Sequence, residues 1–152
     1  MYQRILVPVD GSDTSRKGLE EAVKLAAVTG GRVRLLHLVD ELSAAMSMSA
    51  YGGVSADIFQ LLREGGETVL AAALAYAQSQ QVEADTLLIE GFAGRLSDHV
   101  AEQARLWGAE LVVLGSHGRR GVGRLVMGSD AEQIIRTSLV PVLVVRAVDR
   151  PQ

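Results

Sequence analysis

The sequence contains no cysteine and few aromatic residues. The absence of cysteine among 152 residues excludes disulfide bonds, thiol nucleophiles and cysteine-ligated metals. Aromatic side chains make up only 4% of the chain, which leaves few platforms on which single-stranded nucleic acid could stack. The formal net charge of −3 also argues against a nucleic-acid partner, since nucleic-acid-binding proteins usually carry a basic face.

Long hydrophobic runs are absent as well. No apolar segment is long enough for a membrane span or for the core of a signal peptide, so we expect a cytoplasmic protein without a membrane partner. Apolar residues make up 48% of the chain and charged residues 22%, which is typical of a globular domain. The length suits one domain, which we expect over residues 1–147, followed by a short polar tail over residues 148–152.

Short apolar runs alternate with helical patterns along the whole chain. The runs are rich in β-branched residues, as is typical of buried parallel strands, and they occupy residues 5–9, 32–39, 86–89, 111–114 and 141–145. Apolar residues at helical spacing fill the intervals between them. This alternation predicts a single α/β domain with an open five-stranded parallel sheet and helices on both faces.

Two stretches depart from the regular pattern. Residues 40–56 show no firm period, and we interpret them as an irregular, mobile segment and a candidate lid. Gly65 and Gly66 lie inside the long helical pattern that follows. Each glycine costs a helix about 1 kcal/mol relative to alanine, so the pair predicts a kink or a later helix start.

A glycine-rich stretch, LVVLGSHGRRGVGRLVMGSD, runs from Leu111 to Asp130. It passes from a buried strand into a loop, and Gly128-Ser129 then begins a new helical pattern. Glycines let a backbone approach a ligand closely, and a helix N-terminus carries about half a positive charge, so such a turn suits phosphate. Three arginines lie in the same loop, of which we expect only one to touch phosphate: Arg119, Arg120 and Arg124.

The same glycines are compatible with alternatives to a phosphate site, since glycines after a strand often serve only tight turns. The stretch is not a P-loop, because no Gly-x4-Gly-Lys-Ser/Thr occurs, and Gly121-x-Gly123 lacks the third glycine of a dinucleotide fingerprint. Ser116-His117 is not flanked by the glycines of a nucleophile elbow. The spacing of the glycines and the final serine favour ligand binding.

A ligand in an open α/β sheet binds outside the carboxyl ends of the strands, where the strand order reverses. Because the glycine loop follows the fourth strand, we expect the order 3-2-1-4-5, with the reversal between strands one and four. The crevice would then be lined by the end of the first strand, the end of the second and the glycine loop: Pro8, Val9, Asp10, Val39 and the loop from Gly115.

Chemistry assigns roles to these residues. Ser129 can offer a hydroxyl group and helix amides to phosphate. Asp10 can accept from ribose hydroxyls or hold a divalent cation, here Mg²⁺. Val9 and Val39 can pack on an adenine ring while their backbone groups read its edge. Backbone clearance would come from Gly115, Gly118 and Gly128.

At these residues the chain resembles the universal stress protein family. The resemblance covers ILVPVDGS, RVRLLHLVD, ADTLLIEGFAGRLSDHVAEQA and the segment from Gly108 to Arg146. The nucleotide-binding branch of that family carries Gly-x2-Gly-x9-Gly-Ser/Thr, and this chain has a full match in Gly115, Gly118, Gly128 and Ser129.

The resemblance implies a set of contacts to ATP. They would come from Pro8, Val9, Asp10 and Val39, from the loop (Gly115, Ser116, His117, Gly118, Arg119, Arg120, Gly121), and from the phosphate-binding residues Gly128, Ser129, Asp130 and Ala131. Asp130 departs from the small apolar residue common in the family at that position. The resemblance also implies a homodimer through the last strand, from Pro141 to Val145. An unpaired apolar edge strand invites aggregation, which independently favours a partner there.

Three functions follow as hypotheses. The first is an ATP-binding, nucleotide-sensing stress-response homodimer with at most weak hydrolysis, since no positioned base or nucleophile is evident. The second is a magnesium-dependent nucleotide hydrolase or adenylyl-transfer enzyme that uses Asp10. The third is a dimeric interaction module whose pocket has lost its ligand.

Overall fold

The computed structural model describes residues 1–53, 56–92, 94–117 and 127–146. Within these ranges, strands and helices alternate as predicted, apart from one additional helix. The elements are β1 (Arg4–Pro8), α1 (Asp13–Thr29), β2 (Arg32–Leu38), α2 (Glu41–Ser49), α3 (Ala56–Ser79), β3 (Glu83–Ile89), α4 (Leu96–Trp107), β4 (Leu111–Gly115), α5 (Ser129–Thr137) and β5 (Val142–Val145).

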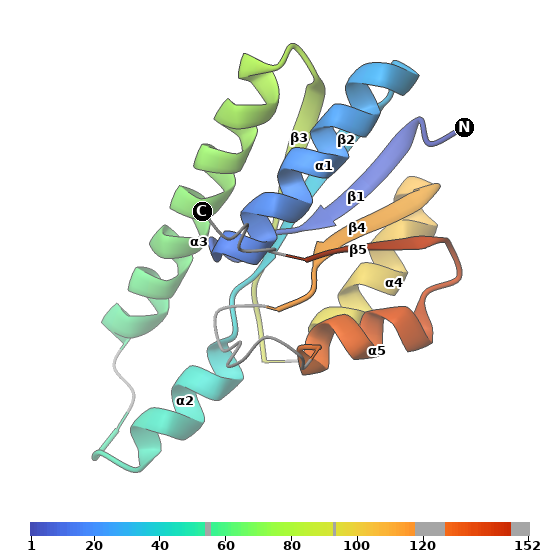
Figure 1. The fold of residues 1–152 in the computed structure, drawn as a ribbon. Coiled ribbons are helices and arrows are strands. Elements are labelled where there is room, and N and C mark those ends of the chain that lie inside the picture. The colour runs from blue at the N-terminus through green and yellow to red at the C-terminus, as the bar shows by residue number, and fades with distance from the viewer. Residues whose placement is uncertain (54–55, 93, 118–126, 147–152) are drawn as a thin grey trace, which may run out of the picture.

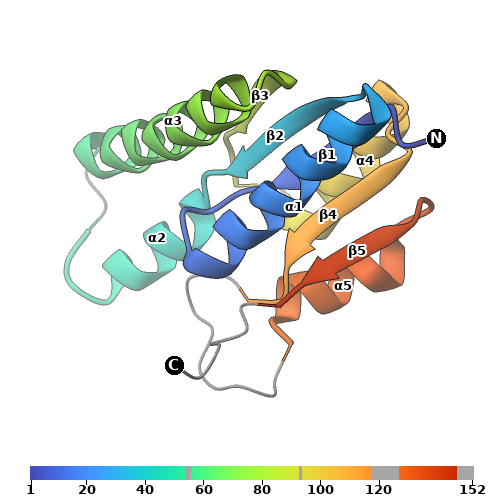
Figure 2. The same cartoon turned by 45° about the horizontal axis from the view of Figure 1, so that its top comes forward.

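The strands form one parallel sheet in the order β3-β2-β1-β4-β5, which confirms the predicted α/β fold and strand order (Figure 1). Helices α1 and α3 cover one face of the sheet, and α4 and α5 cover the other (Figure 2). The order reverses between β1 and β4, because β2 continues the sheet on one side of β1 and β4 on the other. The predicted crevice position is therefore present.

The two faces of the central strand, β1, contribute side chains to two different hydrophobic cores. Ile5 and Val7 of β1 pack in the cluster beneath α1 and α3, whereas Leu6 packs in the cluster beneath α4 and α5. All three side chains are fully buried. This is why the strand reads as a continuous apolar run and not as an alternating one.

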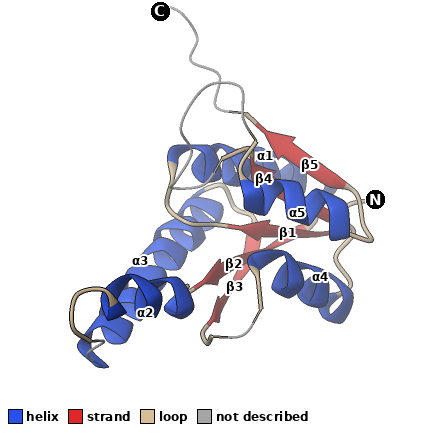
Figure 3. Cartoon of the chain, turned by 90° about the horizontal axis from the view of Figure 1, so that it is seen from below, coloured by secondary structure: helices blue, strands red, loops and turns tan. Residues whose placement is uncertain are grey.

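Residues 41–49 form the additional helix, α2, so the prediction of an irregular segment was wrong. The Asp40 carboxylate caps the helix by accepting a hydrogen bond from the Ser43 N–H at 3.0 Å. No residue of α2 is buried. Figures 1 and 3 show α2 standing away from the sheet, beyond the carboxyl ends of the strands. A helix with no buried face has no need of apolar periodicity, which is why the sequence pattern failed to indicate it.

Helix α3 begins at Ala56 and runs without interruption through Gly65 and Gly66, so the alternative of a later helix start was wrong. The two glycines differ in their surroundings. A Cβ atom at Gly66 would lie 2.7 Å from Cδ2 of His37, whereas one at Gly65 would meet nothing within 4 Å. Gly66 therefore allows a close approach of α3 to the sheet. None of the helices in the described part of the chain is both long enough and apolar enough to cross a membrane.

The two edges of the sheet differ in character. At the β3 edge, Arg34 makes a two-pronged ion pair with Asp85, at 2.7 and 2.8 Å, and its guanidinium lies 4.7 Å from the centre of the Trp107 ring. The hydrogen bond that Arg34 donates to the Asp85 carboxylate raises the pKa of Arg34 above its ordinary value. At the β5 edge, Leu143 is 41% exposed. Charged pairs protect an edge strand from further pairing, so β5 is the edge better suited to another strand.

The first turn of α1 presses against the end of β4. A Cβ atom at Gly115 would lie 2.5 Å from the carbonyl carbon and oxygen of Thr14, and one at Gly18 would lie 3.0 Å from the Gly115 nitrogen. The Thr14 hydroxyl donates a hydrogen bond to the carbonyl of His117. Helix α1 and the end of β4 are therefore in backbone contact, which only glycine permits.

We expect Gly115→Ala to lower the free energy of unfolding by about 1–3 kcal/mol, because the added methyl group must push rigid backbone atoms apart. Urea denaturation would measure the change. Gly65→Ala is the matched control. It fills open space on a helix and should raise stability by up to about 1 kcal/mol. An unchanged urea midpoint for Gly115→Ala would contradict the close contact.

Candidate functional site

Three hydrogen bonds hold the backbone of Val9 and Asp10, directly after β1. The Val9 N–H donates to the carbonyl of Leu36 at 2.8 Å. The Val9 carbonyl accepts from His37 Nδ1 at 2.7 Å, and the Asp10 N–H donates to Ser15 Oγ at 3.1 Å. Neighbouring elements on both sides therefore fix this tip of the central strand.

The Asp10 side chain is half-buried at the start of the α1 turn. Its Oδ1 accepts a hydrogen bond from the Ser12 N–H at 2.9 Å, and Ser12 Oγ in turn caps α1 by accepting from the Ser15 N–H at 3.2 Å. Within the described ranges, no group of three or more His, Asp or Glu side chains could hold a metal ion. A cation at Asp10 would therefore take its other ligands from phosphate and water, as Mg²⁺ commonly does.

The end of β4 is tied to both β5 and α5. The Ser116 N–H donates to the carbonyl of Val145 at 2.8 Å, and the Ser116 carbonyl accepts from the Gly128 N–H at 2.9 Å. The side chain of Ser116 is buried, with its Oγ 2.9 Å from Nδ1 of His117. The Ser116 hydroxyl is thus engaged within the chain.

The side chain of His117 contains a buried polar atom that has no hydrogen-bond partner. This atom is Nε2, and it is the only such buried side-chain atom among the residues that the structure describes. Buried polar atoms are nearly always hydrogen-bonded, so an orphaned one calls for a missing partner. The residues that follow His117, including Gly118, Arg119, Arg120 and Gly121 of the predicted site, lie outside the described residues.

The N-terminus of α5 offers backbone donors. Gly128 is the N-cap residue, and its carbonyl accepts the first helical bond, from the Glu132 N–H at 3.0 Å. The N–H groups of Ser129, Asp130 and Ala131 therefore have no carbonyl acceptor within the helix. Ser129 is exposed, whereas the Ala131 side chain lies in the core, so only the backbone of Ala131 could reach a ligand. Asp130 and Glu132 place two carboxylates in this first turn.

Val39, the residue after β2, is buried, and both of its backbone polar groups already form hydrogen bonds within the chain. Its side chain is only 2% exposed. Its N–H donates to the carbonyl of Ile89 at 2.8 Å, and its carbonyl accepts from the Glu41 N–H at 2.9 Å. The Val39 amide is therefore not available to a base, but a carbonyl oxygen can accept a second hydrogen bond.

The two predicted halves of the site lie side by side. Pro8 ends β1 and Gly115 ends β4, and these strands are neighbours in parallel register. The hydrogen bond from Thr14 to the His117 carbonyl joins the loop after β1 to the loop after β4. Through Ser116, the start of α5 joins the same edge. The structure thus brings the described members of the set together: Pro8, Val9, Asp10, Val39, Gly115, Ser116, His117, Gly128, Ser129, Asp130 and Ala131.

Three residues that support this site were not singled out from the sequence. His37 and Ser15 hold the tip of β1, and Thr14 joins that tip to the β4 loop. The run of hydroxyl residues after Asp10 was a usable signal for Thr14 and Ser15. Nothing in the pattern of β2 set His37 apart from a core histidine.

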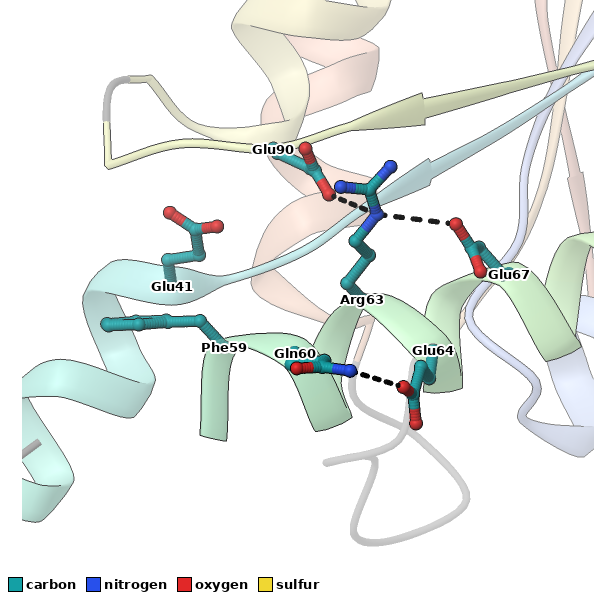
Figure 4. Close-up of a pocket in the computed structure, with 7 residues that line it drawn as sticks. All are labelled: Glu41, Phe59, Gln60, Arg63, Glu64, Glu67 and Glu90. Carbon is teal, nitrogen blue, oxygen red and sulfur yellow. Dashed lines mark hydrogen bonds and ion pairs between the residues drawn. The ribbon is translucent and has the colours of Figure 1, made fainter. Parts of the chain in front are cut away.

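A separate hollow of about 510 Å³ lies between α2, α3 and the end of β3 (Figure 4). Four carboxylates line it, from Glu41, Glu64, Glu67 and Glu90. Arg63 lies between two of them, with its Nε 3.3 Å from Glu67 and 3.1 Å from Glu90. This excess of negative charge would repel phosphate, so the hollow is not the predicted anion site.

Comparison with known proteins is consistent with this geometry. The model of the universal stress protein family matches residues 1–146. The universal stress protein MJ0531 of Methanocaldococcus jannaschii is 32% identical over 146 residues, which are 96% of this chain and 83% of that protein.

Solved structures share the fold at lower identity. The structure of protein MJ0577 from the same archaeon superposes with a TM-score of 0.82 at 23% identity, covering 99% of both chains. A universal stress protein from Archaeoglobus fulgidus, solved in complex with dAMP, has a TM-score of 0.69 at 22% identity and covers 95% of this chain and 98% of its own. With a family model that spans nearly all of its length, this chain belongs to the universal stress protein family.

Proposed function

We propose that the protein binds ATP and acts as a nucleotide-sensing homodimer in a stress response, with at most weak hydrolysis. The observation that carries this proposal is the proximity of two chain segments at one edge of the sheet. The fixed tip of β1, with Asp10, lies beside the end of β4, which is hydrogen-bonded to the N-terminus of α5 through Ser116 and Gly128.

The phosphate groups would lie at the start of α5. Three N–H groups, those of Ser129, Asp130 and Ala131, have no helical acceptors, and the Ser129 hydroxyl belongs to the same turn. The orphaned Nε2 of His117 is a further group that a ligand oxygen or hydroxyl would satisfy. On the family resemblance, we also propose contacts to the same phosphates from Gly118, Arg119, Arg120 and Gly121.

The base would be read by backbone carbonyl groups. Because the Val39 amide already donates to Ile89, the Val39 carbonyl is the group left for the base. A carbonyl accepts from the amino group of adenine and would face an oxygen in guanine, so this arrangement favours adenine. The dAMP bound by the structural neighbour from Archaeoglobus fulgidus supports an adenine nucleotide as the ligand class.

Asp10 would hold Mg²⁺ between its carboxylate and the phosphates. The negative charges of Asp130 and Glu132 at the start of α5 make such a cation useful, since it offsets carboxylates and phosphates together. The second hypothesis from the sequence, a magnesium-dependent nucleotide hydrolase or adenylyl-transfer enzyme, uses the same residue and is distinguished by turnover.

The homodimer would form through β5. This strand is at the edge of the sheet, all four of its side chains are aliphatic, and Leu143 is exposed. The opposite edge strand, β3, carries the ion pairs of Arg32 and Arg34 with acidic residues and is unsuited to pairing. We place the partner strand against the segment from Pro141 to Val145.

We expect Ser129→Ala to weaken ATP binding about tenfold or more, because a hydrogen bond to a charged group is typically worth about 1.5–3 kcal/mol. Isothermal titration calorimetry at a temperature where the protein is fully folded would measure this. Ser79→Ala, at the exposed end of α3, is the control and should bind like the unsubstituted protein. Equal affinities for all three proteins would contradict a phosphate site at α5.

We expect Asp10→Asn to remove the gain in ATP affinity that Mg²⁺ provides, because an amide is a much weaker ligand for Mg²⁺ than a carboxylate. Titrations with Mg²⁺ and with a chelator, for each protein, would show it. Asp13→Asn, an exposed carboxylate paired with Arg16 in the same turn, should keep the gain. Rapid Mg²⁺-dependent phosphate release that Asp10→Asn abolishes would instead favour the hydrolase hypothesis.

We expect Leu143→Lys to convert a dimer into a monomer, because the dimer would otherwise bury two charged side chains. Burial of a leucine is worth about 1.5–3 kcal/mol, so two copies should weaken association more than a hundredfold. Sedimentation velocity would measure the distribution of species. Leu106→Lys, at an exposed site on α4, should leave it unchanged. A dimer that persists in Leu143→Lys would exclude this strand as the interface.

A further inference from the structure

His37 lies between the tip of β1 and helix α3. On one side, its Nδ1 is 2.7 Å from the carbonyl oxygen of Val9. Because a carbonyl oxygen only accepts, Nδ1 carries the hydrogen and donates it. On the other side, the Cδ2–Nε2 edge of the ring faces Gly66 of α3. The ring therefore touches the candidate site and a helix outside that site at the same time.

The bond from His37 fixes one end of a single peptide unit. The carbonyl of that unit belongs to Val9 and accepts from His37, and its N–H belongs to Asp10 and donates to Ser15 Oγ at 3.1 Å. A peptide unit is planar, so holding it at both ends fixes its rotation. The orientation of this unit is one of the two factors that set the direction in which the Asp10 side chain leaves the backbone, the other being the Asp10 φ angle.

Gly66 leaves room for the ring in this position. A Cβ atom there would lie 2.7 Å from Cδ2 and 3.1 Å from Nε2 of His37, and 2.9 Å from a terminal methyl group of Leu88. The Leu88 methyl group can rotate away at little cost. The rigid His37 ring can yield only by moving as a whole, and such a shift would weaken its hydrogen bond to Val9.

We propose that His37 is a positioning residue for the nucleotide site, and that Gly66 of α3 leaves the space its ring needs to reach the Val9 carbonyl. The proposal rests on the proposed binding of ATP with Mg²⁺ at Asp10. It makes α3, which contributes none of the predicted ligand contacts, a determinant of affinity. Substitution of one helical glycine should therefore alter a binding site that the helix does not itself form.

Neighbouring glycines in α3 provide a matched pair for the test. Gly66→Ala should weaken binding of ATP with Mg²⁺ about fivefold, the equivalent of one ordinary hydrogen bond. Gly65→Ala makes the same chemical change one residue away, in open space, and should leave affinity unchanged. Thermal unfolding of both variants identifies a temperature at which each is fully folded, so that a difference in affinity reflects the site and not stability.

Substitutions at His37 separate positioning from packing. His37→Phe keeps the ring but removes the donor, and it should weaken binding about fivefold. His37→Asn keeps a donor at nearly the position of Nδ1 in a smaller side chain, and it should bind nearly as well as histidine. In the His37→Asn background there is room for a methyl group, so Gly66→Ala should then have no effect on affinity. Such a loss of effect in the double variant is the signature of coupling between the two residues.

A measurement without ligand distinguishes failure of this proposal from failure of the proposed function. Long-range ¹H–¹⁵N spectra of the histidine rings should show a protonated Nδ1 for His37 in the unsubstituted protein and in Gly65→Ala. The same signal should be lost or mixed in Gly66→Ala. If these spectra behave as expected but no protein binds ATP, the proposed function is wrong and the contact stands. If the unsubstituted protein binds ATP and Gly66→Ala has the same spectrum and affinity, the positioning role of His37 is wrong.

Discussion

The site depends on how closely α1 approaches the end of β4. Gly115 and Gly18 bring the backbone of the helix into contact with the backbone of the strand, and no larger side chain fits at Gly115 without moving Thr14. This contact fixes where the loop after β1 begins relative to the loop after β4. Asp10 and the start of α5 belong to segments more than a hundred residues apart. The pairing of β1 with β4 brings them to one edge of the sheet, and the Gly115 contact lets α1 lie close to that edge.

The charges around the start of α5 have opposing effects on the binding of an anion. The N-terminus of α5 favours an anion through its unpaired N–H groups, but Asp130 and Glu132 lie in the same turn, and Asp10 lies at the same edge of the sheet. Carboxylates at a helix N-terminus stabilise the helix and also compete with a phosphate for its positive end. Mg²⁺ held by Asp10 would offset these carboxylates and the phosphates of a bound nucleotide together.

The sequence was sufficient for the strand order and for the meeting of Pro8 and Gly115, because continuous apolar runs and glycine-marked ends locate buried parallel strands. It was insufficient for α2, since a helix without a buried face leaves no periodic signal. The sequence also did not indicate that the Val39 amide donates to a neighbouring strand, or that the His37 ring packs against α3. Both depend on which residue of a neighbouring element lies opposite, Ile89 in one case and Gly66 in the other. Such pairings depend on strand register and side-chain packing, which the pattern of residues in one sequence does not specify.

The first glycine of the binding motif is explained by packing within the chain. Gly115 matches the first position of the motif, and the sequence suggests that it clears space for phosphate. In the structure, the atoms that a Cβ at Gly115 would strike belong to Thr14 and Ser15 of α1, so packing alone explains this glycine. Its presence is therefore no independent support for a ligand. That support comes instead from groups which packing leaves unexplained: the N–H groups at the start of α5 and the orphaned Nε2 of His117.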